Sequence, residues 1–211
     1  FTYTLAGTTP CPNAISTVTV AEVAAPNAGT SSATTVCSND GPFNMTLRLG
    51  GTPQVGTWTF GGNAHNDLFI PGVDLPGVYV YTVPGVAPCT AAIATLTVGV
   101  NQAPNAGVNG DTLTCSTGAS FGLFGLLSGG ATTGGTWTGP GGVHSGMYDP
   151  DVDVPGDYVY TRTGLTPCVA DIAVVTVTEN PVANAGTNGT ISLCSGGTSV
   201  ALLSVLGGNP S

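Results

Sequence analysis

Apolar and polar residues alternate along this chain with a period of two. The clearest case is residues 91–98, where one face carries Ala92, Ala94, Leu96 and Val98. Such alternation is typical of half-buried β-strands. Gly and Pro clusters separate the alternating runs, and no window shows a helical stripe. The pattern predicts six strands, near residues 33–37, 43–49, 55–60, 67–70, 77–83 and 90–98, and a short lead strand near 27–30. It places four further valines on the same inner face: Val18, Val20, Val175 and Val177.

The strand pattern itself recurs. The tetrapeptide Pro-Asn-Ala-Gly at 26–29 returns at 104–107 and, with Ala first, at 183–186. Cys37, Cys115 and Cys194 follow these openings at one offset, and they mark the period of the repeat. The repetition predicts two whole repeats, 26–103 and 104–182. Residues 1–25 match the C-terminal part of a preceding repeat and 183–211 the N-terminal part of a following one, which indicates a window on a longer array.

Recurring aromatic residues sharpen the expected fold. The pattern Asp-x-Pro-Gly-x-Tyr-x-Tyr at 74–81 and 153–160 resembles the Asp-x-Gly-x-Tyr-x-Cys corner of immunoglobulin-like domains. The resemblance implies corner tyrosines at Tyr79 and Tyr158, and core residues at Tyr81, Tyr160, Trp58 and Trp137. We therefore expect tandem small Ig-like antiparallel β-sandwich domains.

Six cysteines without a CxxC motif indicate an oxidising, extracellular setting. Pairing Cys37–Cys89 and Cys115–Cys168 would staple each repeat, closing loops of about 52 residues worth roughly 4 kcal/mol each. In a strict Ig topology, however, Cys37 and Cys89 could lie at opposite poles. The alternative joins cysteines that are neighbours along the chain, with the same spacing in every pair: Cys11–Cys37, Cys89–Cys115 and Cys168–Cys194. Free thiols are the third alternative.

Composition excludes several partners. The net charge is −9, and the chain has no Lys and only two Arg, Arg48 and Arg162. Such a chain cannot build a phosphate-binding surface, so binding to nucleic acid or anionic lipid is not expected. No apolar run approaches the roughly 18 residues of a membrane helix, so we expect no membrane span in this segment.

Candidate chemistry is sparse. Three carboxylates at alternate positions are weak candidates for Ca²⁺ ligands: Asp149, Asp151 and Asp153. Of the three, only Asp153 recurs in the first repeat, as Asp74. We expect Asp74 and Asp153 to accept hydrogen bonds in a tight turn instead. His65 and His144 recur without the partners of a catalytic triad and are expected to be structural.

One modification site is a candidate, and no reaction is. Asp111-Thr112-Leu113 resembles an O-glycosylation sequon of Bacteroidetes, which makes Thr112 the candidate. Aromatic residues and cysteines that recur at fixed phase are what a repeated core demands, whereas a catalytic centre would normally occur once. The sequence therefore predicts no enzyme, no cofactor and no metal.

The combined motifs resemble the repeats of giant cell-surface adhesins of Bacteroidetes, including the gliding-motility type. They are the Pro-Asn-Ala-Gly opening, the following Cys, Gly-Thr-Trp-Thr-Gly-Pro-Gly-Gly, Tyr-Asp-Pro, Pro-Gly-x-Tyr-x-Tyr-Thr and Pro-Cys before a Thr-Val strand. The resemblance covers the whole chain, and 104–182 fits best. It implies type IX secretion and a place in long filaments on the cell surface. The implied partners are neighbouring repeats and other copies in a filament, with a surface or glycan ligand elsewhere in the full protein.

These features predict a structural stalk module of an extracellular surface adhesin. Two alternatives remain: a carbohydrate-binding module of a secreted protein, and a self-assembling extracellular fibre subunit. Exposed Trp58 and Trp137 on a sheet face would favour sugar binding, whereas buried ones would favour the stalk.

Overall fold

The structure, a computed structural model, describes residues 1–208. The chain forms two compact units, each with its own β-sheets. The first unit consists of Phe1–Ala103 together with Thr166–Cys168, and the second of Pro104–Leu165 and the residues from Val169 onward. The loop at 166–168 therefore belongs to the first unit, although the sequence period assigns it to the second repeat.

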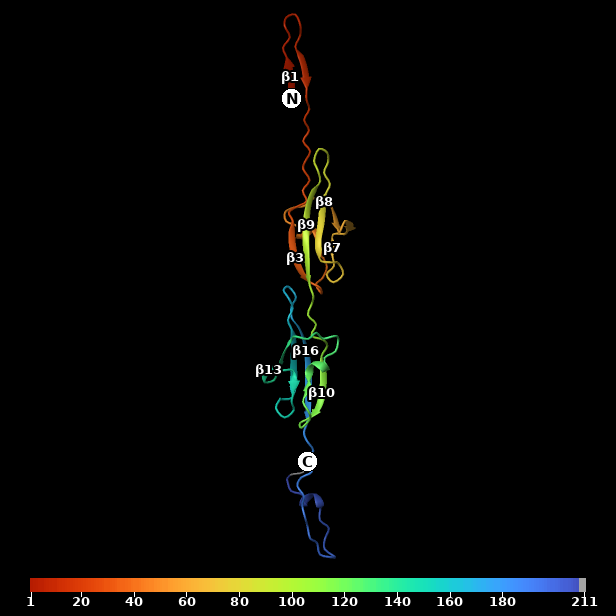
Figure 1. The fold of residues 1–211 in the computed structure, drawn as a ribbon, viewed down its shortest axis with the longest axis vertical. Coiled ribbons are helices and arrows are strands. Elements are labelled where there is room, and N and C mark those ends of the chain that lie inside the picture. Colours follow the sequence, from red (N-terminus) through yellow and green to blue (C-terminus); the bar gives the residue numbers. More distant parts are fainter. Residues whose placement is uncertain (209–211) are drawn as a thin grey trace. The chain divides into compact units, whose positions relative to one another are not determined.

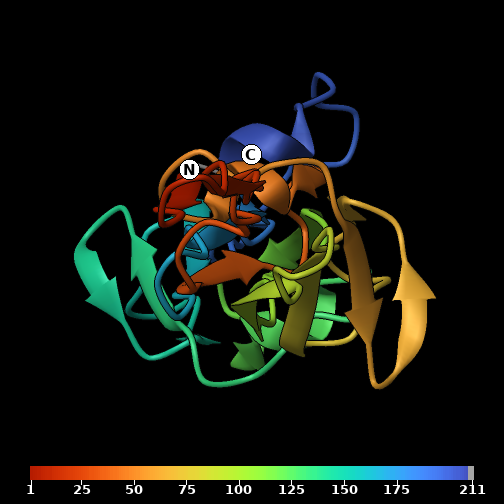
Figure 2. The ribbon, with the colours of Figure 1, turned by 90° about the horizontal axis from the view of Figure 1, so that it is seen from above.

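Seven strands build the main body of the first unit. They are β3 (Ser32–Cys37), β4 (Phe43–Asn44), β5 (Thr57–Phe60), β6 (Asn63–His65), β7 (Leu68–Phe69), β8 (Gly77–Val83) and β9 (Ala92–Asn101). Five of them form one sheet in the order β3-β9-β8-β5-β6, while β4 and β7 pair as a separate ribbon. Figure 1 shows β3, β9 and β8 side by side, and Figure 2 shows the gold β5–β6 hairpin at the edge of its sheet.

The second unit repeats this plan. Its strands are β10 (Gly110–Cys115), β11 (Phe121–Gly122), β12 (Thr136–Gly139), β13 (Gly142–His144), β14 (Met147–Tyr148), β15 (Gly156–Arg162) and β16 (Asp171–Asn180). The sheet order is β10-β16-β15-β12-β13, and β11 pairs with β14. The all-β sandwich predicted from the alternating pattern is therefore confirmed, and so is the Ig-like fold that the corner motif implied.

One pairing differs from the expected antiparallel arrangement. The first strand of each sheet runs parallel to the last: β3 pairs with β9 and β10 with β16, whereas the other pairs are antiparallel. The register sets Cys37 opposite Asn101 and Cys115 opposite Asn180. Because these strands are parallel, the chain enters the sheet at one pole and leaves it at the other.

Burial follows the predicted alternation. Along β9 the side chains of Ala94, Leu96 and Val98 are buried, whereas Ile93 is 64% exposed. Each unit has a separate core cluster. The two-stranded ribbon of β4 and β7 forms the second layer over the buried face of the sheet. The Phe69 ring of β7 packs edge-on against Tyr79, with ring centroids 5.6 Å apart.

Several expected strands are shorter than the sequence suggested, and two of them differ most. In the predicted strand 43–49, only β4 is extended, and a 3₁₀ turn, η1 (Thr46–Arg48), follows it. The same turn recurs as η2 (Leu123–Leu126) and η3 (Leu202–Val205). The lead strand near 27–30 is reduced to a single bridge between Thr30 and Gly50. The sequence analysis missed β6, which has only three residues.

The flanking segments form only part of this plan. Residues 1–25 form a hairpin of β1 (Thr2–Leu5) and β2 (Ala14–Thr17). Val18 and Val20, which we expected on an inner face, are exposed, because none of the described residues forms a second layer over this hairpin. In the following segment, the bridge between Thr187 and Gly207 matches that between Thr30 and Gly50. Residues 209–211 of the predicted segment 183–211 lie outside the described residues.

Candidate functional site

The corner tyrosines tie each sheet to its preceding loop. The Tyr79 hydroxyl donates a hydrogen bond to the Leu75 carbonyl at 2.7 Å, and the Tyr158 hydroxyl donates to Val154 at 2.8 Å. Both bonds reach four residues upstream, as in the tyrosine corner of immunoglobulin domains. The local motif thus forms the corner that its resemblance implied.

The second tyrosine of each pair anchors the loop before the Trp strand. Tyr81 donates to the Gln54 carbonyl and Tyr160 to the Thr132 carbonyl, at 2.7 and 2.8 Å. Tyr160 also accepts the Gly135 N–H, and a Cβ at Gly135 would lie 2.5 Å from its ring. Only glycine therefore permits this approach.

The two tryptophans are interior residues. Trp58 is 3% exposed and Trp137 is 7% exposed, and each packs on its neighbouring tyrosine with ring centroids 4.9 and 5.0 Å apart. A sugar-binding platform needs an aromatic face open to solvent, so this burial favours the stalk over the carbohydrate-binding alternative.

The two cores differ beside the tryptophan. In the first unit Trp58 donates its indole N–H to the Thr46 hydroxyl at 3.0 Å, next to an open groove of about 450 Å³. One period later Phe124 takes the place of Thr46 and packs edge-on against Tyr160 at 5.5 Å. The groove thus reflects a Phe-to-Thr difference between the repeats, and Trp58 remains buried beside it.

The recurring histidines pair with the recurring aspartates. His65 Nε2 lies 3.5 Å from Asp74, and His144 Nε2 lies 3.2 Å from Asp153. The same aspartates close the expected turns by accepting the N–H of Ile70 and of Asp149. Each His–Asp pair therefore fixes the turn before the tyrosine strand. In residues 1–208 no group of three or more His, Cys, Asp or Glu side chains is placed to hold a metal ion.

The turn uses the carboxylates of two of the three alternating aspartates. Asp153 accepts the Asp149 N–H at 2.8 Å, and Asp149 accepts the Asp151 N–H at 3.1 Å. These two carboxylates therefore accept hydrogen bonds from the backbone of their own turn, and the bond to Asp149 is that of an Asx turn. Thr112, the candidate for glycosylation, lies half-buried in the middle of β10 opposite Val177. Its modification stays a prediction.

Acid should weaken the second unit through Asp153. Burial favours the neutral carboxyl, but the Asp149 N–H and the His144 imidazole outweigh it and hold the pKa of Asp153 below its ordinary value of 3.8. A lowered folded-state pKa adds stability above the unfolded pKa, and this is lost as the pH falls through the folded pKa. We expect thermal melts of Asp153→Asn to depend less on pH below about 4 than melts of the native chain.

The matched control for this prediction is Asp151→Asn, since Asp151 is exposed and accepts no hydrogen bond from a described residue through its carboxylate. This variant should retain the native pH profile. Superimposable profiles for Asp153→Asn and the native chain would contradict the role given to Asp153.

Sequence reasoning missed a polar pair in the second core. The buried Tyr148 hydroxyl donates to Glu179 at 2.6 Å, and burial and this hydrogen bond raise the pKa of Tyr148. One period earlier the same places hold Phe69 and Val100, which pack in the first core. Both members of the pair thus differ together between the two repeats. This joint difference is visible in the sequence only when one repeat is aligned on the other.

Tyr148→Phe should destabilise the second unit by about 1–2 kcal/mol, because Glu179 loses its donor while remaining half-buried. The double variant with Glu179→Val restores the pair of the first repeat and should recover most of this loss. Urea unfolding of both single variants and the double variant measures the coupling. Additive effects would show that the pair contributes nothing.

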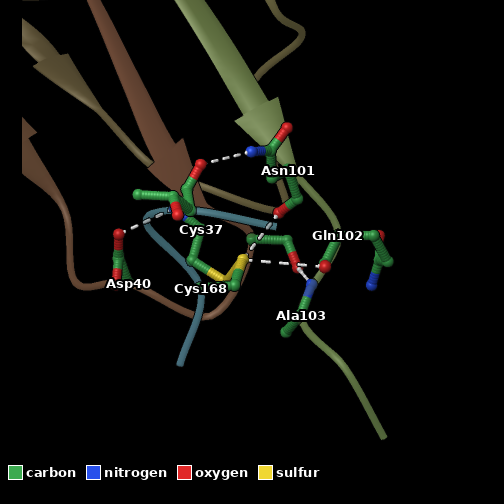
Figure 3. Close-up of a disulfide and its surroundings, with 8 residues drawn as sticks. Cys37, Asp40, Asn101, Gln102, Ala103 and Cys168 are labelled. Carbon is green, nitrogen blue, oxygen red and sulfur yellow. Dashed lines mark hydrogen bonds between the residues drawn. A yellow bond between two sulfur atoms is a disulfide. The ribbon is translucent and has the colours of Figure 1, made fainter. Parts of the chain in front are cut away.

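The disulfide lies at the C-terminal pole of the first sheet. Cys37, at the end of β3, is bonded to Cys168, with 5.0 Å between their Cα atoms and a sequence separation of 131. Figure 3 shows the bond beside the end of β9, where the Cys168 sulfur lies 3.4 Å from the Asn101 carbonyl oxygen. The Asn101 side chain donates to the Thr166 carbonyl at 2.7 Å and holds the same loop. Closing so long a loop is worth about 5 kcal/mol in unfolded-state entropy.

This bond differs from both pairing schemes expected from the sequence. Cys37 is the last residue of β3 and Cys89 precedes β9, so the parallel pairing of these strands sets the two cysteines at opposite poles. A ten-residue strand is roughly 33 Å long, whereas bonded cysteines need Cα atoms within about 7 Å. Cys115 and Cys168 are separated in the same way, because Cys115 ends β10 and Cys168 precedes β16, the parallel partner of β10. The alternative scheme also fails, because Cys37 and Cys168 are bonded to each other.

Four cysteines are free thiols: Cys11, Cys89, Cys115 and Cys194. The Thr117 backbone N–H and hydroxyl, by hydrogen bonding to sulfur, lower the pKa of the exposed Cys115 thiol. A lower pKa gives more thiolate near neutral pH, and the thiolate is the form that attacks disulfides.

No protein-family model matches this sequence, and no curated protein matches it. Among solved structures, a three-domain immunoglobulin fragment of the titin I-band is similar, with 14% identity and a TM-score of 0.43. The match covers 72% of this chain and 64% of the fragment. Sidekick-1 immunoglobulin domains 1–4 give 11% identity and a TM-score of 0.39 over 75% of this chain and 48% of theirs. The chain thus spans less than two thirds of either neighbour. In residues 1–208 no helix has the length and hydropathy needed to cross a bilayer.

Proposed function

We propose that this chain is part of the stalk of an extracellular surface adhesin, in which tandem Ig-like repeats act as spacers. The observation that carries the proposal is the parallel pairing of the first and last strands in both sheets. Each repeat receives the chain at one pole and releases it at the other, so every added repeat advances the chain by about the length of its last strand. A module that folds back on itself would not act as a spacer.

Three further observations support a structural role. The recurring aromatic residues fill separate cores, and the recurring histidines and aspartates close turns. The surface carries few charges and many Thr residues, so its contacts should depend little on salt. The disulfide agrees with a secreted protein, since disulfides persist in oxidising compartments. Cell-surface location, type IX export and gliding motility belong to this proposal through the resemblance of the repeats.

Two measurements on the 211-residue chain test the proposal. On a glycan array, the chain should bind no sugar. Under force in dithiothreitol, which opens the disulfide, the chain should unfold in discrete steps, each from one unit. Retention of a glycan that is lost on Trp58→Ala, but not on Trp137→Ala, would instead favour the carbohydrate-binding alternative at the groove beside Trp58. Growth of oligomers by sedimentation, with no added partner, would favour the fibre subunit.

A further inference from the structure

We propose that the disulfide between Cys37 and Cys168 is one rung of a periodic series, in which the strand-end cysteine of each repeat bonds the loop cysteine of the next. Cys115 would then bond the loop cysteine of a following repeat, and Cys89 the strand-end cysteine of a preceding one. The partner is another copy of the same repeat. This inference rests on the proposed tandem array.

The repeat period makes the bonded and the free cysteines equivalent. Cys37 is a strand-end cysteine, as are Cys115 and Cys194, whereas Cys168 is a loop cysteine, as are Cys11 and Cys89. The bond at Cys37 joins a strand-end cysteine to the loop cysteine one repeat later. No bond joins a strand-end cysteine to a loop cysteine of its own repeat among the described residues.

The loop of Cys89 contacts the end of the preceding repeat as the loop of Cys168 does. The Cys89 thiol lies 3.5 Å from the Val23 carbonyl oxygen, and Val23 is the counterpart of Asn101 one period earlier. The loop cysteine thus docks on the end of the preceding repeat in both copies, although only one copy has a bonded partner. The docking therefore does not depend on the disulfide.

An unfilled hollow lies beside the Cys89 thiol. An open hollow of about 440 Å³ beside this thiol is lined by Ala25, Pro26, Pro88 and Thr90. At the bonded copy, Ala103 is the counterpart of Ala25, and its N–H donates to the Ser38 hydroxyl at 3.0 Å. Ser38 directly follows Cys37, so the turn after β3 occupies this place there (Figure 3). The occupant proposed for the hollow is the same turn of a preceding repeat.

The strand-end cysteine of the second repeat is presented in the same way. Ser116 N–H donates to the Asn180 carbonyl as Ser38 N–H does to Asn101. Gly118 N–H donates to the Cys115 carbonyl as Asp40 N–H does to Cys37. The turn after β10 therefore has the backbone of the turn after β3, with an exposed thiol in place of a buried disulfide.

Formation of each rung needs an oxidant, for which we name a small-molecule disulfide such as oxidised glutathione. The Cys115 thiolate attacks one of its sulfurs and releases one glutathione thiolate. The loop cysteine then attacks the mixed disulfide and releases the second. Two protein thiols thus lose two protons and two electrons, and one glutathione disulfide becomes two glutathione thiols.

The experiment extends the full chain by one repeat. Appending residues 133–182 after Ser211 keeps the period, because Ser211 is the counterpart of Thr132. After folding in glutathione buffer, peptide mapping without reductant should find Cys115 bonded to the added loop cysteine, and the free thiols should fall from four to three. In the control Cys115→Ser, the added cysteine should stay free. A free Cys115, or a bond between the added cysteine and Cys194, would overturn the inference.

A second extension tests the other end and guards against a misfolded product. Placing residues 26–78 before Phe1 also keeps the period, because Phe1 is the counterpart of Tyr79. Cys89 should then bond the added strand-end cysteine, and a free Cys89 in a folded chain counts against the series. Force spectroscopy in dithiothreitol, read together with the peptide map, separates the two ideas. An added unfolding step in a chain whose map lacks the new disulfide contradicts the inference alone, whereas absence of discrete steps contradicts the stalk.

Discussion

Reduction of the disulfide should lengthen the fully stretched chain by roughly 440 Å, because a stretched chain spans about 3.4 Å per residue. With the bond intact, tension applied at the two ends passes from Cys37 to Cys168 through sulfur, and the segment between them, at a sequence separation of 131, carries none of it. Once the bond is reduced, that segment can unravel and extend. Most of both sandwiches lies within the segment, so the bond protects them from force.

Single-molecule stretching with and without dithiothreitol measures this difference. The variant Cys37→Ser provides the matched control, since its contour length should be long under both conditions. Cys115→Ser removes a free thiol and should respond to reductant as the native chain does. Equal lengths for the native chain with and without reductant would mean that the disulfide is absent in solution.

Trp137→Ala should unfold the second unit and spare the first. Truncating a buried aromatic residue typically costs about 3–5 kcal/mol, which is most of the stability of a domain of this size. Trp137 packs in the core cluster of the second unit, and Trp58 in that of the first. Because the chain has only these two tryptophans, the one that remains reports on the other unit.

The measurement combines Trp58 fluorescence with far-ultraviolet circular dichroism during heating. In Trp137→Ala, the dichroism should lose a large part of its amplitude at a lower temperature than the fluorescence change of Trp58. The reciprocal variant, Trp58→Ala, should show the reverse. Simultaneous loss of both signals in either variant would argue that the two cores fold as one.

The strands and the core were open to prediction from residue pattern alone. Period-two alternation separates Ala94, Leu96 and Val98 from Ile93, and burial in the structure follows the same division. Recurrence of Trp58 as Trp137 pointed to interior packing, because a repeated core needs the same filling each time. The corner motif predicted the role of Tyr79 and Tyr158 through a local bond that spans only four residues.

The disulfide was not open to prediction in the same way. Alternation is identical in parallel and antiparallel strands, so the sequence could not show that β3 runs parallel to β9. That single direction decides whether Cys37 lies near Cys89 or at the far pole. The equal spacing of cysteines that are neighbours along the chain suggested bonds between those neighbours, whereas the observed bond has a sequence separation of 131. Long-range pairing of this kind depends on where the chain leaves each sheet, which no local motif encodes.

The long disulfide also changes what a protease can do to this chain. Any single cut between Cys37 and Cys168 leaves two fragments that remain joined through sulfur. The exposed turns at Gly61-Gly62 and Gly141-Gly142 fall inside this interval, and such loop tips are the usual sites of nicking. A nicked chain would therefore still connect whatever is attached at its two ends, and would come apart only when reduced.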